Sequence, residues 1–403
     1  MDNQKGFATR SIHGGIEWKD MYPHPVNAPI FASSTFAFPS VDYGARVFSG
    51  DEPDGYTYGR LANPTIRDVE MRIAALESGE ECVVLGSGMA AVASLTLALL
   101  KAGDHLVADK TLYGGTHSLF THKLPELGIE VTFVDASDPK NVEDAIKENT
   151  KLIYFETPTN PVLRLVPIKP IAEIGKKHGI LTAIDNTFMS PVLCRPIEMG
   201  VDIVLHSATK YLNGQSDLIA GALISTHELV GEFRMEAVHL GGILGPFEGY
   251  LLGRGLKTIK LRVLQADKNA MEVARYLENH IMVKKVYYPG LESHPQHELA
   301  KEQQEGFGSM MGFELDGDFE LTKAFVDSLH LITRAVSLGG VETLISHPSS
   351  TTHSIVSEED RALAGITDTY MRLAVGIEDV EDIIADLEQA FAAIKRIAPH
   401  AAD

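Results

Sequence analysis

The chain has 403 residues, of which 44% are hydrophobic and 22% charged, a composition typical of a globular protein with room for two domains. Its 35 basic and 55 acidic residues give a net charge of −20. Because this charge repels phosphate groups and anionic membrane surfaces, we expect no nucleic-acid and no membrane partner.

Apolar segments and cysteines narrow the class of protein further. The N-terminus lacks an apolar signal core, and the longest apolar stretch, Met89 to Leu100, is too short to cross a bilayer. The two cysteines, Cys82 and Cys194, are too few for a disulfide framework, and the sixteen histidines lack the partners of a zinc site. We therefore expect a cytoplasmic protein without a metal centre.

The first 60 residues are rich in proline, glycine and aromatic residues and show no sustained period, which predicts an extended arm. Asn63 and Pro64 then form a typical helix start. Apolar residues at helical spacing as far as Leu76, with Gly79 beyond them, predict the first helix of a compact domain.

Short apolar runs alternate with helical patterns over the next part of the chain. The runs predict strands over 82–85, 105–109, 130–135, 151–156, 180–185, 201–206 and 218–225, and helices begin near 89, 116, 141 and 168. This alternation predicts an α/β fold, with a mostly parallel sheet covered by helices on both faces.

The pattern changes after Gly253-Arg254-Gly255. A long helical stretch follows, then runs over 310–315, 331–336 and 371–376, and a closing helix over 380–397. We therefore divide the chain into an extended arm (1–60), a larger α/β domain (61–255) and a smaller α+β domain (256–403).

Ligands of parallel sheets gather beyond the carboxyl ends of the strands, so the residues that follow each predicted strand are candidates for a site. The first such segment is Gly86-Ser87-Gly88-Met89-Ala90-Ala91, where small residues and a helix N-terminus predict a phosphate cradle. With Asp109 ending the next strand, the same segment also fits a dinucleotide fingerprint, so an oxidoreductase stays possible, as does a plain turn.

The second segment is Ile184-Asp185-Asn186. A carboxylate at the end of a buried strand is costly unless it has a cationic or hydrogen-bonding partner. A protonated pyridine nitrogen is one such partner, and a capping role for Asp185 is an equal alternative.

The third segment is His206-Ser207-Ala208-Thr209-Lys210-Tyr211, which places Lys210 210 − 185 = 25 positions after Asp185. The two hydroxyls can hold a phosphate, and the amine beside them can bind an aldehyde covalently. A lone lysine after a strand is usually a surface residue. The combination with the cradle and Asp185 nevertheless favours a pyridoxal 5′-phosphate (PLP) enzyme over a nicotinamide enzyme.

With these motifs the chain resembles the PLP-dependent family of Cys/Met metabolism, which includes methionine γ-lyase, cystathionine γ-lyase, cystathionine γ-synthase and homoserine-ester sulfhydrylases. The resemblance runs from about Phe7 to the last helix. Its most specific segments are Tyr58–Thr65, Gly86–Met89, Tyr113–Thr116, Asp185–Thr187, His206–Tyr211 and Ala335–Gly340.

The resemblance implies a fold-type I, aminotransferase-like subunit in a homotetramer made of two tight dimers, with each active site shared across a dimer interface. It also implies residue roles for the cofactor. Lys210 would bind PLP covalently and move protons, and Asp185 would pair with the pyridine nitrogen. The phosphate would be held by Gly88, Met89, Ser207 and Thr209, and by Tyr58 and Arg60 from the neighbouring subunit's arm.

The remaining implied roles concern the ring and the substrate. Asn160 would bond the ring hydroxyl or the substrate carboxylate, and Tyr113 would stack on the ring and act as the acid for the leaving thiol. Arg372 would bind the substrate carboxylate with Ser337 beside it. Without the resemblance, Asn160 reads as a turn residue and Arg372 as a surface ion-pair residue.

The preferred reading of the resemblance is α,γ-elimination from methionine or homocysteine, which gives 2-oxobutanoate, ammonia and a thiol or sulfide. It relies on Tyr56–Thr65 and Ser346–Ser354. Gly115 replaces a cysteine common in methionine γ-lyases, Thr57 replaces an acidic residue typical of cystathionine enzymes, and Gln215 replaces a common histidine. A cystathionine γ-lyase or γ-synthase, an O-acetyl- or O-succinylhomoserine sulfhydrylase, and a PLP-binding regulatory protein therefore stay as alternatives.

Overall fold

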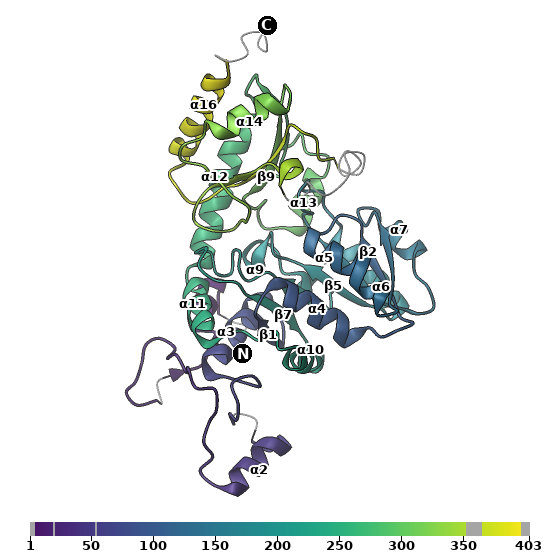
Figure 1. Cartoon of the computed structure of the whole chain (residues 1–403), viewed down its shortest axis with the longest axis vertical. Coiled ribbons are helices and arrows are strands. Elements are labelled where there is room, and N and C mark those ends of the chain that lie inside the picture. Colours follow the sequence, from purple (N-terminus) through teal and green to yellow (C-terminus); the bar gives the residue numbers. More distant parts are fainter. Residues whose placement is uncertain (1–4, 19–20, 53–54, 352–364, 396–403) are drawn as a thin grey trace.

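The computed structural model describes residues 5–18, 21–52, 55–351 and 365–395. They form a large α/β body, a smaller part above it and an N-terminal arm below it in the view of Figure 1. Among the residues described, none of the helices has the length and apolarity that crossing a membrane requires.

The body is built on a seven-stranded sheet in the order β1-β7-β6-β5-β4-β2-β3. Neighbouring strands are parallel, except that β7 is antiparallel to β1 and β6. The strands are β1 Glu81–Leu85, β2 His105–Asp109, β3 Glu130–Val134, β4 Thr150–Glu156, β5 Leu181–Asp185, β6 Ile203–His206 and β7 Gly221–Ser225. Each coincides with a predicted run, so the mostly parallel α/β sheet is confirmed.

Helices cover both faces of this sheet. In β4, Leu152 and Tyr154 belong to one core cluster, whereas Ile153 and Phe155 belong to another. The first cluster includes residues of α4 (Gly88–Leu99) and α10 (His227–Leu240), and the second includes residues of α3 (Pro64–Glu77), α8 (Ile168–His178) and α11 (Pro246–Leu256). Strands buried on both faces are apolar at every position, which is why they appear as continuous runs in the sequence.

The start of α3 is as predicted, because the Asn63 side chain accepts the N–H of Thr65 and Pro64 is the first helical residue. Its end differs slightly: Ser78, not Gly79, adopts the left-handed cap conformation. Short helical segments complete the body, namely α5 Gly114–Ser118, η2 Leu119–Lys123, α6 Leu124–Glu126, α7 Pro139–Asp144, α9 Ser190–Leu193 and η3 Pro196–Met199.

The smaller part holds a five-stranded sheet in the order β10-β11-β12-β9-β8, antiparallel except for the β10–β11 pair. Its strands are β8 Val283–Tyr287, β9 Met310–Leu315, β10 Thr333–Arg334, β11 Leu344–Ser346 and β12 Tyr370–Ala374. Strands β8 and β11 were not predicted, and β10 is shorter than the predicted run over 331–336. The edge strand β8 carries exposed lysines that hide its apolar pattern, and β11 is too short to show one.

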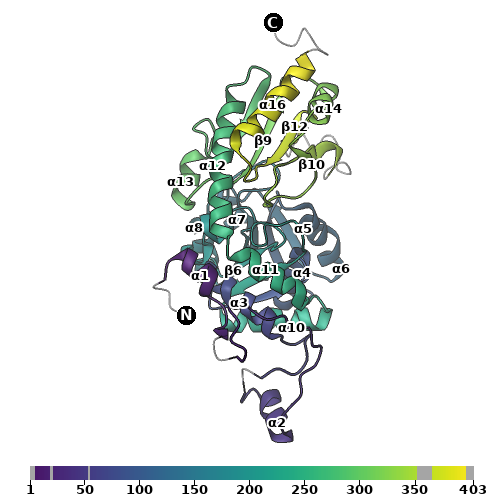
Figure 2. The same cartoon turned by 90° about the vertical axis from the view of Figure 1, so that its left-hand side faces the viewer.

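Helix α12 (Ile259–Glu278) connects the body to the smaller part (Figure 2). Helices α13 (His297–Gln303), α14 (Phe319–Asp327) and α16 (Val380–Lys395) and the turn η4 (Pro348–Ser350) complete that part. The predicted closing helix extends to residue 397, which lies outside the described residues.

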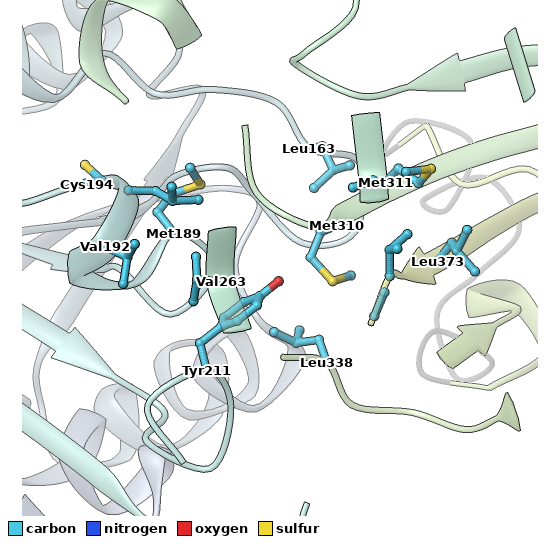
Figure 3. Packing of buried hydrophobic residues seen from close by; sticks show 14 of the residues in the cluster. Leu163, Met189, Val192, Cys194, Tyr211, Val263, Met310, Met311, Leu338 and Leu373 are labelled. Carbon is cyan, nitrogen blue, oxygen red and sulfur yellow. The ribbon is translucent and has the colours of Figure 1, made fainter. Parts of the chain in front are cut away.

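One core runs from the body into the smaller part. Figure 3 shows Tyr211 of the body and Val263 of the connecting helix α12 near Met310 and Leu338 of the smaller part. A continuous core of this kind resists movement of one sheet against the other.

The arm is not wholly extended, which corrects the prediction for residues 1–60. It contains α1 (Phe7–His13) and α2 (Val41–Ser49), and α2 stands apart from the body in both views (Figures 1 and 2). Ser40 caps α2 and Gly50 ends it in the left-handed region. Val41 and Phe48 on α2 are 89% and 71% exposed. No comparison tests the boundaries between arm and domains, which stay a prediction.

Candidate active site

The carboxyl ends of the central strands bring together residues that are far apart in sequence. Glu156 at the end of β4 lies opposite Asp185 at the end of β5, and Asp185 lies opposite Leu205, just before His206, in β6. The loops that follow these strands carry Asn160, Thr187 and Lys210. Because β2 neighbours β4, the loop of Tyr113 reaches the same edge of the sheet.

Lys210 lies in the turn after β6, and its Nζ donates a hydrogen bond to Ser337 Oγ at 2.7 Å. Ser337 comes from the segment between β10 and β11 and has φ of 113°, a rare and strained value for a residue with a side chain. Burial, assisted by the positive charge of Arg372, lowers the pKa of Lys210 to about 8. A larger fraction of the amine is therefore neutral and nucleophilic near neutral pH.

Asp185 is held by Thr187. Its Oδ1 accepts the backbone N–H of Thr187 at 3.0 Å, while Thr187 Oγ1 accepts the N–H of Ser207 at 2.8 Å. Burial raises the pKa of Asp185, and hydrogen bonds from Thr187 together with the nearby His206 oppose that rise. Thr187 links two predicted site residues but was not predicted itself; a hydroxyl two positions after an aspartate was the available signal.

The predicted phosphate cradle has little free space around its backbone. Ser87 caps α4 by accepting the N–H of Ala90 at 3.0 Å. A Cβ on Gly88 would lie 3.0 Å from the Cβ of Ser207, and a Cβ on Gly221 would lie 2.1 Å from the carbonyl oxygen of Ser87. Glycine at these positions lets the start of α4, with Met89, approach Ser207 closely.

Two observations refine the residues around this cradle. The hydroxyl of Thr209 accepts the N–H of Ala220 at 3.0 Å and donates to its carbonyl at 3.2 Å, so in this structure it faces backbone.

Asp109 is 1% exposed and receives two hydrogen bonds from Arg164, at 2.7 and 2.8 Å. A dinucleotide enzyme would need that carboxylate for a ribose, so this pairing argues against the oxidoreductase reading.

Arg372 in β12 is buried beside Lys210. It donates through Nη1 to Asn160 Oδ1 at 3.0 Å and through Nη2 to the Ser337 carbonyl at 3.1 Å. Its Nε has no hydrogen-bond partner among the described residues. A buried guanidinium with a free donor is suited to an anionic ligand group such as a carboxylate.

Tyr113 and Asn160 share one partner that was not predicted. Glu156 accepts the N–H of Tyr113 at 3.1 Å and the N–H of Asn160 at 2.9 Å, while the Tyr113 side chain stays half exposed. Burial and the charge of Asp185 raise the pKa of Glu156 well above its usual value. Like Asp185, Glu156 ends a buried strand, and that shared position was the signal available in the sequence.

Tyr58 and Arg60 do not join this group. Arg60 donates to the carbonyl of Val238 in α10 at 3.2 Å, and its guanidinium lies 5.6 Å from the Tyr58 ring centroid. Among the described residues, no hydrogen bond or ion pair connects either of them with Lys210. The structure thus brings ten of the twelve predicted site residues to the sheet edge and leaves the two arm residues outside it.

The residues at the sheet edge fit PLP. Lys210 offers an activated amine, the start of α4 offers backbone donors for a phosphate, and Asp185 is a partly buried carboxylate with no lysine or arginine partner in the described part of the chain. A protonated ring nitrogen would supply the missing cation.

Comparison with known proteins decides the family. The family described as Cys/Met metabolism PLP-dependent enzyme matches residues 8–392. The chain belongs to this family. It is 48% identical to the L-methionine γ-lyase of Fusobacterium nucleatum subsp. nucleatum over 96% of this chain and 98% of the relative, and 45% identical to the cystathionine γ-lyase of Bacillus subtilis over 95% and 98%.

A solved structure agrees in fold. The cystathionine γ-lyase of Lactobacillus plantarum in complex with L-serine superposes with a TM-score of 0.90 at 40% identity, covering 97% of this chain and all of that one. The predictions of a fold-type I subunit, of PLP as cofactor and of a PLP-dependent carbon–sulfur lyase are therefore confirmed. When bound, PLP supplies the electron sink that this chemistry requires.

The depressed pKa of Lys210 predicts how apoprotein takes up its cofactor. Only the neutral amine reacts with an aldehyde, so the rate of PLP capture should rise with pH through a midpoint of about 8. Replacing Arg372 by Met removes a positive charge and should move this midpoint to higher pH. Absorbance changes after rapid mixing with PLP at a series of pH values measure the midpoint. An unchanged midpoint in the variant would contradict the statement that the Arg372 charge lowers the pKa of Lys210.

Proposed function

We propose that this enzyme eliminates the γ-substituent of methionine or homocysteine, consuming one water and releasing 2-oxobutanoate, ammonia and methanethiol or hydrogen sulfide. The observation that carries the proposal is the 48% identity to a methionine γ-lyase over nearly the whole of both chains. The cluster of Lys210, Asp185 and Arg372 at one edge of the sheet supports it, because these residues supply an amine, a carboxylate and a guanidinium for the cofactor and the substrate.

In the proposed reaction the residues of the chain move protons and hold charges. The Lys210 amine takes the proton from Cα and then assists loss of a proton from Cβ, and the Tyr113 hydroxyl gives a proton to the sulfur as the Cγ–S bond breaks. Arg372 binds the substrate carboxylate through its free Nε, and Asn160 holds the Arg372 guanidinium in place.

We further propose that Asp185 pairs with the ring nitrogen and that Gly88, Met89, Ser207 and Thr209 hold the cofactor phosphate. The short distance between Gly88 and Ser207 supports this arrangement. For Thr209, the hydroxyl would exchange its bond with Ala220 for one with the phosphate.

For the assembly, we propose that Tyr58 and Arg60 complete the phosphate site of a neighbouring subunit in a homotetramer. The contact of Arg60 with Val238 instead of its own Lys210 cluster and the exposed apolar residues of α2 support this. We also propose a cytoplasmic location, which the two free, buried cysteines support.

The test of substrate is a product assay across methionine, homocysteine, cystathionine, cysteine and O-acetylhomoserine. We expect 2-oxobutanoate and a thiol or sulfide from methionine or homocysteine at higher kcat/KM than from cystathionine. Preferred turnover of cystathionine would favour the second candidate, a cystathionine γ-lyase, which the 45% identity to the Bacillus subtilis enzyme keeps open. Turnover only with the homoserine ester plus sulfide would overturn the proposal in favour of a sulfhydrylase.

Gly115 offers a sharper test of the leaving-group site. A Cβ at this position would lie 2.7 Å from Cε1 of the Tyr113 ring and 2.9 Å from Sδ of Met89. Gly115→Ala should therefore displace the Tyr113 ring and lower kcat/KM for methionine by about tenfold, since small misplacements of reacting groups have large kinetic effects. Gly114→Ala is the matched control, because nothing lies within 4 Å of its Cβ. Equal activity of the two variants would show that the Tyr113 ring tolerates the displacement.

A further inference from the structure

Glu156 holds two of the proposed site loops at once. It is 6% exposed, its Oε1 accepts the N–H of Asn160 at 2.9 Å, and its Oε2 accepts the N–H of Tyr113 at 3.1 Å. Tyr113 follows β2 and Asn160 follows β4, so one carboxyl group joins loops that belong to different strands. The described chain gives Glu156 no lysine or arginine partner that would explain a structural ion pair.

The neighbourhood of Glu156 makes a buried carboxyl group costly. Its register partner on β5 is Asp185, a second carboxyl group that is partly buried. Burial and the Asp185 charge raise the pKa of Glu156 well above its usual value. Of the two, Asp185 is better placed to keep a negative charge, because the nearby His206 opposes the rise of its pKa, whereas Asp185 itself adds to the rise for Glu156. Because burying the Glu156 carboxyl group beside a second carboxyl group is unfavourable, we expect Glu156 to have a role beyond packing.

The contacts of Asn160 extend the influence of Glu156 to the substrate side. Asn160 Oδ1 accepts from Arg372 Nη1 at 3.0 Å. Glu156 thus holds Tyr113 directly and holds Arg372 through Asn160. These two residues face opposite ends of the proposed substrate, the leaving sulfur and the carboxylate.

We propose that Glu156 is a positioning residue that sets the placement of Tyr113 and, through Asn160, of Arg372 during elimination. This inference rests on the proposed function of Tyr113 and Arg372. Both carboxyl oxygens of glutamate can accept a backbone N–H, whereas glutamine has one accepting oxygen and must turn its NH₂ group toward the other N–H. Glu156→Gln keeps the volume of the side chain and removes this property.

The first test compares Glu156→Gln and Glu156→Ala with the unaltered holoenzyme. With misplaced loops, we expect kcat for methionine to fall by about 10- to 100-fold and KM to rise, while PLP binding and its absorbance are retained. The matched control is Glu70→Gln. Glu70 is also buried and accepts a backbone N–H, from Val84 at 3.2 Å, but its ion pair with Arg234 lies away from the site. This control should lower the melting temperature and leave kcat and KM unchanged.

The second test is a double-mutant cycle with Tyr113→Phe. If Glu156 acts on kcat by placing Tyr113, adding Glu156→Gln to Tyr113→Phe should lower kcat by much less than it does alone. The inference would be overturned if the losses in kcat from the two substitutions were fully additive in the double variant. It would also be overturned if Tyr113→Phe were slow but the Glu156 variants kept their kcat and KM. A Tyr113→Phe variant with full activity would instead show that the proposed role of Tyr113 is wrong, so the two failures are distinguishable.

Discussion

Lys210→Ala is expected to abolish turnover of methionine and to remove the absorbance band of covalently bound PLP. The variant loses both the amine that binds the cofactor and the group that moves protons, and general acid–base catalysis alone is worth about 10²- to 10⁴-fold. We therefore expect a loss of at least about 10³-fold in kcat. Product release and the absorbance spectrum of the purified protein measure the two effects.

A second lysine provides the control for this substitution. Lys110 also follows a strand of the large sheet, but its side chain is 53% exposed and pairs with Asp135 at 3.0 Å. Lys110→Ala should keep the absorbance band and full turnover. A Lys210→Ala protein that still shows the band and releases 2-oxobutanoate would contradict the assignment of the cofactor lysine.

The second large effect is expected for Asp185→Asn. The amide keeps the shape of the side chain but cannot neutralise a protonated ring nitrogen, so the electron sink weakens. Loss of one preorganised electrostatic group costs about 10²- to 10³-fold in kcat, and we expect a decrease of that size. Steady-state kinetics with methionine and a titration of apoprotein with PLP measure the decrease and any loss of cofactor affinity.

Asp202 is a suitable control because it makes the same kind of contacts away from the site. It accepts the N–H and the hydroxyl of Thr182 at 2.8 and 2.7 Å, near the amino ends of β5 and β6. Asp202→Asn should lower stability and leave kcat unchanged. Equal kinetic losses in both variants would mean that Asp185 acts through the stability of the sheet and not through the cofactor.

The exceptions among the predicted elements follow from weak local patterns. Most of the body strands are apolar and buried on both faces, so their positions were visible without a structure; β3, less buried, still carries an apolar run. Strand β8 at the sheet edge and the three-residue β11 lack such a pattern, since an edge strand carries charges and a short strand has few positions. Helix α2 has capping residues, but it lies among the prolines and glycines that predicted an extended arm.

The candidate site was predicted where its chemistry is local in the chain. Gly88 at a helix start, Asp185 at a strand end and Lys210 after the next strand each follow from neighbouring residues and the rule for parallel sheets. Glu156 and Thr187 also sit at or just after a strand end. Nothing local distinguishes them from capping residues, and their roles appear only when neighbouring loops are in place.

By itself the sequence determined the order of the strands along the chain, the residues at their carboxyl ends and the cofactor that such residues suit. Only the tertiary structure decided which of them meet. Lys210 contacts Ser337 127 positions away, and Asn160 contacts Arg372 212 positions away. The physical reason is that spacing along a chain sets local conformation, whereas contacts between distant segments depend on which strands pair and on how the two sheets share one core.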